Sequence, residues 1–194
     1  MKHTELNAFL RRVETMGVYF YTKDTLQRAF PSDDPVALER ALGRHVASKL
    51  IDRPARNVYA SPRAGLDLPC GWSSFVRFMR PLDRFYLSLE TRLSELGVIS
   101  QVTSVITLVS SGRSNNFDTP YGKIEVNHLK TLPEVESLEW DDRREVWLAS
   151  PMRAYEDMKS LSNRSIDLVD MDELEAAEDE FAPSDIYETS RATP

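Results

Sequence analysis

Positively charged side chains recur at short intervals between residues 40 and 63 of this 194-residue sequence. Arg40 and Arg44 lie one turn apart if residues 35–50 form a helix, so both face the same side. Guanidinium groups placed in this way can bind guanine edges or phosphate oxygens, and loop arginines usually contact the phosphate backbone. The candidate DNA contacts are Arg40, Arg44, Ser48, Lys49, Arg53, Arg56 and Arg63.

An alternative interpretation needs no ligand for these side chains. Charged residues on the outer face of an amphipathic helix are often only solvated, and charges at a hairpin tip keep an exposed loop soluble. Glu39 lies beside the same face and weakens its positive field. The order of the surrounding elements and the local excess of positive charge favour DNA as the partner.

The sequence contains few histidines and cysteines, the residue types that often support catalysis or bind metals. His3, His45 and His128 are far apart, Cys70 is the only cysteine, and no histidine pair has metal-ligand spacing. A nuclease reading would use Asp118 and Glu125 as metal ligands, but the lysine usually found two residues after the second acid is replaced by an asparagine. We therefore expect no catalytic residue, no metal and no cofactor, and a protein that is not an enzyme.

Charge is distributed unevenly along the chain, although the net formal charge is −7. Residues 1–65 carry 11 Lys and Arg against 7 Asp and Glu, residues 66–170 carry 12 against 16, and residues 171–194 carry 1 against 8. The basic part can release counterions from phosphate, whereas the acidic end would be repelled by it. The single cysteine and the absence of an apolar run long enough to cross a bilayer indicate a cytoplasmic protein without a membrane partner.

The elements predicted for residues 4–61 surround the candidate arginines. Apolar residues spaced by three and four predict a helix over residues 4–16, with Thr4 as a possible N-cap and Gly17 as its stop. A short strand at 18–22, a helix at 23–30 and a helix at 35–50 follow; Asp34 is suited to cap the last of these. Residues 51–61 are expected to form a hairpin, and this order is typical of a winged helix.

The remaining sequence mixes helices and strands. Residues 61–71, which are rich in Pro and Gly, are the best candidate linker. We expect a helix over residues 84–97, a buried strand near 102–111, a long turn and a second strand near 123–129 paired with it. A short strand and a helix starting near Pro151 come next, and residues 171–181 can form one more helix.

The chain resembles the AbiEi-type antitoxins of type IV toxin–antitoxin, or abortive-infection, systems. The resemblance covers about residues 19–170 and is most specific in the middle of the chain. The residues that carry it are YFYTKDTLQRAF, ALGRHVASKLIDRPARNVYA, LSLETRLSELGVISQ, ITLVSSGRSNNFDTPYGKIEVNHLK and WLASPMRAYEDM. Two positions differ from the usual pattern: the join after the third helix reads SKLID without glycine, and Asn57 stands where glycine is common.

This resemblance implies a winged-helix domain at residues 1–65 that binds operator DNA, an α/β antitoxin domain at residues 66–180 and an acidic tail at residues 181–194. The fold class is then α/β (α+β). The partners implied are the operator of the protein's own operon and a nucleotidyltransferase-like toxin, which the family generally counters without a stable complex. The alternatives are a solitary regulator, a protein-interaction module that never binds DNA, or the nuclease described above.

Overall fold

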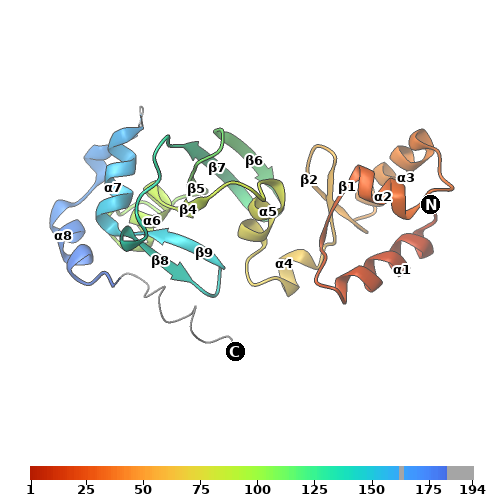
Figure 1. The fold of residues 1–194 in the computed structure, drawn as a ribbon, viewed down its shortest axis with the longest axis horizontal. Coiled ribbons are helices and arrows are strands. Elements are labelled where there is room, and N and C mark those ends of the chain that lie inside the picture. Colours follow the sequence, from red (N-terminus) through yellow and green to blue (C-terminus); the bar gives the residue numbers. More distant parts are fainter. Residues whose placement is uncertain (162–163, 183–194) are drawn as a thin grey trace. The chain divides into compact units, whose positions relative to one another are not determined.

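The structure, a computed structural model, describes residues 1–161 and 164–182 and is a mixed α/β protein with two sheets (Figure 1). The chain forms two compact units. Unit 1 comprises Met1–Met79 together with Phe117–Tyr121, and unit 2 comprises Arg80–Asn116 and the described residues from Gly122 onward. The first boundary falls at residue 79, whereas the sequence places it at residue 65.

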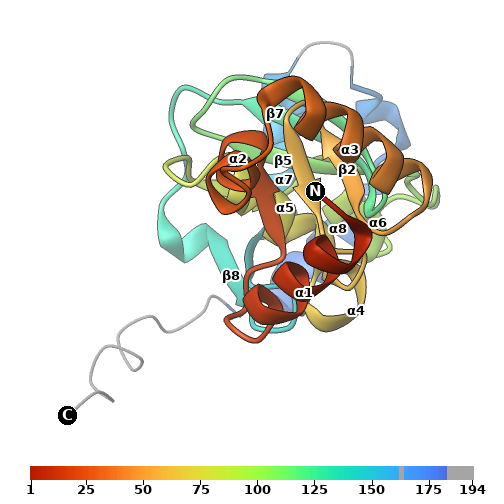
Figure 2. The same ribbon diagram turned by 90° about the vertical axis from the view of Figure 1, so that its right-hand side faces the viewer.

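Unit 1 combines helices with a small antiparallel sheet. Its elements are α1 (His3–Glu14), β1 (Phe20–Thr22), α2 (Lys23–Ala29), α3 (Pro35–Ala47), β2 (Asp52–Ala55), β3 (Val58–Ala60), α4 (Ala64–Asp67) and α5 (Gly71–Met79). The strand order is β1-β3-β2, with Tyr21 opposite Tyr59 and Ala55 opposite Val58. Figure 2 views this unit from the side of α1, α2 and α3, with the sheet behind them.

Both ends of α3 are fixed by local hydrogen bonds. The Asp34 carboxylate accepts from the amides of Val36 and Ala37, and Pro35 occupies the first turn, as the sequence predicts. At the other end Lys49 has a φ of 57°. The Lys49 amide donates to the Val46 carbonyl and the Leu50 amide to the His45 carbonyl, which is the hydrogen-bond pattern usually completed by glycine. Lysine therefore fills the position where the SKLID join lacks a glycine.

The N-cap of helix α1 lies two residues earlier than predicted. Lys2 is the N-cap, and its amide donates to the Glu5 carboxylate at 2.6 Å, so the prediction of Thr4 as the cap is wrong. Because the helix starts at His3, Glu5 occupies its third position and supplies the acid of a capping box. The apolar face of α1 packs into the first core, which contains Leu6, Leu10, Tyr21, Leu26, Leu38, Leu42, Ile51 and Tyr59.

The predicted linker at residues 61–71 is wrong, because this segment folds within unit 1. It contains helix α4, and the Ser61 amide donates to the Tyr19 carbonyl. Ala64 is fully buried. The proline and glycine content that suggested a linker instead marks the turns around a short helix.

An aromatic cluster completes unit 1. Its members are Phe20, Phe75, Phe78, Phe117 and Tyr121, whose ring centroids lie between 5.3 and 6.3 Å apart in the contacting pairs. Residues 117–121 thus pack with α5 and β1, although nearly forty residues of chain separate them from α5. A Cβ added at Gly71 would lie 2.8 Å from the Tyr121 ring, so this approach needs glycine.

Unit 2 is built around the larger sheet and the helices at its C-terminal end. Its elements are β4 (Phe85–Leu87), α6 (Leu89–Glu95), β5 (Val105–Ser110), β7 (Gly122–His128), β8 (Leu138–Asp141), β9 (Val146–Ala149), α7 (Pro151–Ser160) and α8 (Met171–Asp179), with short 3-10 turns at Val135–Ser137 and Ile166–Leu168. Strand β6 (Asn115–Thr119) begins in unit 2, and its residues from Phe117 onward belong to unit 1. The sheet order is β6-β7-β5-β4-β9-β8. Strand β5 is parallel to β7, and β4 is parallel to β9.

Two predictions for this region differ from the structure. The expected helix over residues 84–97 begins with strand β4, and only Leu89–Glu95 is helical. The predicted pairing of the strands near 102–111 and 123–129 is confirmed, since β5 pairs with β7, but the two strands are parallel and the segment between them is more than the expected long turn. The polar segment between them contains β6, which reverses the chain direction before β7 enters the sheet.

The C-terminal helices agree with the sequence predictions. Helix α7 starts at Pro151, capped by the Ser150 hydroxyl, and α8 spans Met171–Asp179. The second core brings together α6, α7 and α8 around Leu93, Met158 and Leu174, each with 0% exposure. Of the predicted tail at 181–194, residues 183–194 lie outside the described part of the chain. None of the helices in residues 1–161 and 164–182 is long and apolar enough to span a membrane.

Candidate nucleic-acid interface

The outer face of α3 carries the two arginines that the sequence singles out. Leu38 and Leu42 turn into the core with 0% exposure, which leaves Arg40 and Arg44 exposed. Within residues 1–161 and 164–182, neither arginine has a carboxylate in ion-pair contact. Two guanidinium groups one turn apart are therefore available to an external anion.

The acidic neighbour of these arginines is neutralised within the unit. The Lys23 ammonium lies 2.7 Å from the Glu39 carboxylate. This hydrogen bond and the lysine charge hold the pKa of Glu39 below its usual range. Glu39 therefore weakens the positive field of α3 less than the sequence suggests.

The β2–β3 hairpin and the end of α3 supply the next cations. The Arg53 guanidinium lies 5.9 Å from the centre of the Tyr59 ring, an arrangement that orients the side chain without removing its charge. Arg56 and Asn57 form the hairpin turn, and Asn57 adopts the left-handed conformation, with a φ of 60°. Lys49 and Ser48 are exposed where α3 leads into the hairpin.

Arg63 differs from the other six candidates because its charge is already paired. Its guanidinium lies 2.8 Å from the Asp67 carboxylate and 3.9 Å from the Glu14 carboxylate. The three residues line a groove of 510 Å³ together with Arg11, Thr15 and Tyr19. The four-residue spacing of Arg63 and Asp67 is a sequence signal for this pairing, but it has meaning only if residues 64–67 are helical and do not form a linker.

His45 lies on the inner face of α3, beneath the exposed arginines. It is 7% exposed, and its Nε2 atom has no hydrogen-bond partner within the described structure. Burial lowers the pKa of His45, and the positive charges of His3, Arg44 and the N-terminus add to this effect, while a backbone hydrogen bond at Met1 opposes it. The buried imidazole is therefore harder to protonate than a solvated one, and it lies on the opposite side of α3 from the exposed arginines.

The two carboxylates of the nuclease alternative occupy different units. Asp118 is exposed on β6, in the segment that belongs to unit 1, whereas Glu125 lies on β7 in unit 2. Glu125 is held by Arg164, whose guanidinium lies 2.5 Å from it and also binds Glu90 and Asn127. In the described ranges, no group of three or more His, Cys, Asp or Glu side chains is placed to hold a metal ion.

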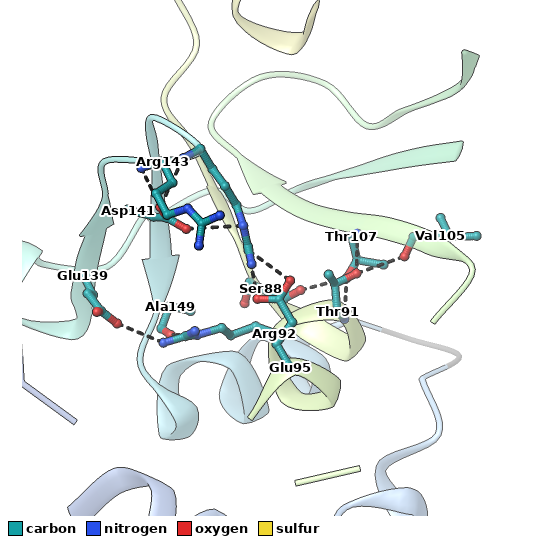
Figure 3. A network of polar contacts seen from close by, with 11 residues as sticks. Ser88, Thr91, Arg92, Glu95, Val105, Thr107, Glu139, Asp141, Arg143 and Ala149 are labelled. Carbon is teal, nitrogen blue, oxygen red and sulfur yellow. Dashed lines mark hydrogen bonds and ion pairs between the residues drawn. The ribbon is translucent and has the colours of Figure 1, made fainter. Parts of the chain in front are cut away.

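Other arginines of unit 2 are tied into a polar network around α6 (Figure 3). Arg92 is 7% exposed; it donates to the Ala149 carbonyl at 2.8 Å and to the Glu139 carboxylate at 3.1 Å. Arg144 lies 2.9 Å from Glu95 and 3.3 Å from Asp141. These guanidinium groups join α6 to the β8–β9 hairpin, so they act as cross-links within the fold.

A second polar network in unit 2 is centred on Asp157, which has no exposed surface. Its carboxylate accepts hydrogen bonds from Tyr86 at 2.9 Å, Ser88 at 2.6 Å and Arg153 at 2.7 Å. Burial raises the pKa of Asp157, while the hydrogen bonds and the arginine charge oppose that rise. The four-residue spacing of Arg153 and Asp157 was the only sequence signal for this cluster, since the contacts with β4 join residues about seventy positions apart.

No family model matches the chain, and no curated protein matches it at a significant level.

Proposed function

We propose that this protein is an autoregulatory antitoxin whose unit 1 binds operator DNA as a winged helix. The observation that carries the DNA-binding half is the outer face of α3. Arg40 and Arg44 are exposed there with no carboxylate partner among the described residues, and the one adjacent acid, Glu39, is paired with Lys23.

The element order of unit 1 supports the same proposal. Three helices and three strands follow in the order α1, β1, α2, α3, β2 and β3, and the sheet order is β1-β3-β2. In this proposal α3 enters the major groove, and Arg40 and Arg44 contact base edges or phosphate. Ser48, Lys49, Arg53 and Arg56 contact the backbone beside it. Arg63 has no part in the interface, because Asp67 and Glu14 hold its guanidinium.

A promoter–reporter assay tests the DNA-binding half in the cell. The region upstream of the gene is fused to a reporter, and the full chain is supplied in trans. The double variant Arg40→Ala, Arg44→Ala should relieve repression. The control is Arg11→Ala, Arg12→Ala, which removes the same charge from the exposed side of α1 and should leave repression intact. Equal repression by the wild type and the α3 variant would contradict the proposal.

The antitoxin half rests on the resemblance of residues 87–130 to the AbiEi-type antitoxins. In this proposal unit 2 counters a nucleotidyltransferase-like toxin encoded beside the gene. Co-expression with the neighbouring gene tests it: the neighbour alone should arrest growth, and the full chain should restore growth. The Arg40→Ala, Arg44→Ala variant should still restore growth, because neutralisation is assigned to unit 2. A neighbour that is harmless when expressed alone would refute this half and leave the DNA-binding half intact.

A further inference from the structure

A second group of basic side chains lies in unit 2, at the end of the sheet where β5 and β7 finish. Arg84 directly precedes β4, Arg113 follows β5, His128 is the last residue of β7, and Lys130 comes two residues later. The register pairs Phe85 with Ser110 and Ser110 with His128. These side chains are therefore attached to three adjacent strand ends. We call Arg84, Arg113, His128 and Lys130 the basic rim.

The loop that carries Arg113 is fastened to the strands on both sides. The Arg84 amide donates to the Ser111 hydroxyl at 3.1 Å, and the Ser111 amide donates to the Arg84 carbonyl at 3.0 Å. On the other side, the His128 amide donates to the Ser114 hydroxyl at 2.9 Å, and the His128 ring lies 3.0 Å from the Gly112 carbonyl. Backbone and side-chain hydrogen bonds within unit 2 thus hold the rim in place before any ligand binds.

Close packing beneath the loop also fixes its position. A Cβ added at Gly112 would lie 1.8 Å from the Asp83 carboxylate, so a larger residue there would displace the Asp83 side chain. Asp83 in turn lies 3.1 Å from the Arg80 guanidinium, which donates to the Arg113 carbonyl at 2.5 Å. The acid nearest to the loop is therefore neutralised by Arg80, and the outer cations keep their charge.

The cations of the basic rim lack the carboxylate partners that hold the network arginines of unit 2. Arg84, Arg113, His128 and Lys130 are all exposed. In the part of the chain that the structure describes, Arg84, Arg113 and Lys130 have no carboxylate in ion-pair contact, whereas Arg92, Arg144, Arg153 and Arg164 each have at least one. Unpaired guanidinium and ammonium groups grouped on one edge form a binding surface for anions.

We propose that the basic rim binds the phosphate backbone of a nucleic acid. Ligands of open sheets bind beyond the carboxyl ends of parallel strands, and β5 and β7 are parallel and both end at the rim. A small phosphorylated ligand is usually enclosed in a concave pocket, whereas these four side chains are all exposed, which suits an extended polymer. The site is separate from α3 and does not depend on the function proposed for unit 1.

Binding to labelled nucleic acid of arbitrary sequence tests the proposal with the full chain. The rim variant is Arg84→Gln, Arg113→Gln and Lys130→Gln. Its matched control is Lys123→Gln, Arg143→Gln and Lys159→Gln, which changes the charge of unit 2 equally; Lys123 lies at the other end of β7 from His128. Both sets are made in the Arg40→Gln, Arg44→Gln background, so that binding by α3 does not hide the result.

At about 50 mM salt the rim variant should bind a single-stranded or duplex 30-mer at least about tenfold more weakly than the control. The slope of log K against log salt should also fall by about two to three, because each lost phosphate contact contributes about 0.7–0.9.

Equal affinities for the rim variant and the control would overturn the proposal. Loss of pyrophosphate binding with unchanged oligonucleotide binding would also overturn it, in favour of a small ligand. Whether α3 binds operator DNA is tested separately, by comparing the Arg40→Gln, Arg44→Gln variant with the wild type. The rim variant and its control can be compared whatever that result is.

Discussion

The arginines on α3 of unit 1 differ in their partners from the arginines of the polar networks in unit 2. In unit 1, Arg40 and Arg44 are exposed and have no carboxylate partner among the described residues. In unit 2, Arg92, Arg144, Arg153 and Arg164 are bound to carboxylates, mostly from other elements. The difference shows that the number of cations in a segment says little about ligand binding. Whether each cation is already paired decides what it can bind.

Burial follows the same division. Unit 2 buries the ionisable side chains Arg92 and Asp157, with 7% and 0% exposure. In the described part of unit 1, the buried polar side chains are His45, Ser61, Ser73 and Thr119, so none is an aspartate, glutamate, lysine or arginine. Unit 2 thus adds buried ion pairs to its apolar core, whereas the described core of unit 1 is apolar and aromatic.

The largest expected effect comes from breaking a buried pair in unit 2. Asp157→Ala should lower the free energy of unfolding by about 2–5 kcal/mol, because it leaves the Tyr86 and Ser88 hydroxyls without their acceptor, at about 1–3 kcal/mol each, and removes one of the two carboxylates that bind Arg153. Glu156→Ala is the control: it is exposed on the same helix, lies 3.0 Å from Arg153 and should cost about 0–1 kcal/mol. Denaturant unfolding measures both, and similar losses would contradict a structural role for the buried pair.

A smaller effect is expected from disturbing the aromatic packing of unit 1. Gly71→Ala places a methyl group 2.8 Å from the Tyr121 ring and should cost about 1–3 kcal/mol. Gly43→Ala, where nothing lies within 4 Å of the new atom, should instead stabilise α3 by about 0.5–1 kcal/mol. Thermal unfolding of the two variants gives the comparison, and shifts of the same sign would show that Gly71 does not contact Tyr121 as described.

The smallest expected effect is a pH dependence in unit 1. Because the pKa of His45 is lowered in the folded state, the unfolded chain binds more protons over the interval just below the ordinary histidine pKa. Stability should therefore be complete above about pH 6.5 and decrease as the pH falls through that interval. His45→Gln should reduce this dependence, whereas His128→Gln, which replaces an exposed histidine, should preserve it. Identical pH profiles for wild type and His45→Gln would exclude this origin.

Local signals in the sequence predicted the elements of unit 1 that position the arginines. Asp34 and Pro35 mark the start of α3, and the spacing of Leu38 and Leu42 identifies its buried face. These signals are local because capping and periodicity depend on residues within a few positions of one another. The exposure of Arg40 and Arg44 follows from the same periodicity.

The pairing in unit 2 could not be predicted from local signals. The residues Arg164 and Glu90 are 74 positions apart, and Arg92 and Ala149 are 57 positions apart. The short apolar strand β4 was read as part of a helix, because a three-residue run next to an amphipathic helix fits either period. The parallel pairing of β5 and β7 was missed for a related reason: the polar sequence of β6 looked like a turn, although it forms an edge strand.

The central claim is that unpaired arginines on α3 bind DNA. Fluorescence anisotropy with the duplex upstream of the gene measures it directly at one fixed salt concentration. Arg40→Gln with Arg44→Gln should raise Kd by about 30-fold or more, since each specific contact contributes about 1–3 kcal/mol. Arg11→Gln with Arg12→Gln, which removes the same charge from unit 1, should change Kd by less than about threefold. Equal losses of affinity in the two variants, or no loss in the first, would contradict the claim.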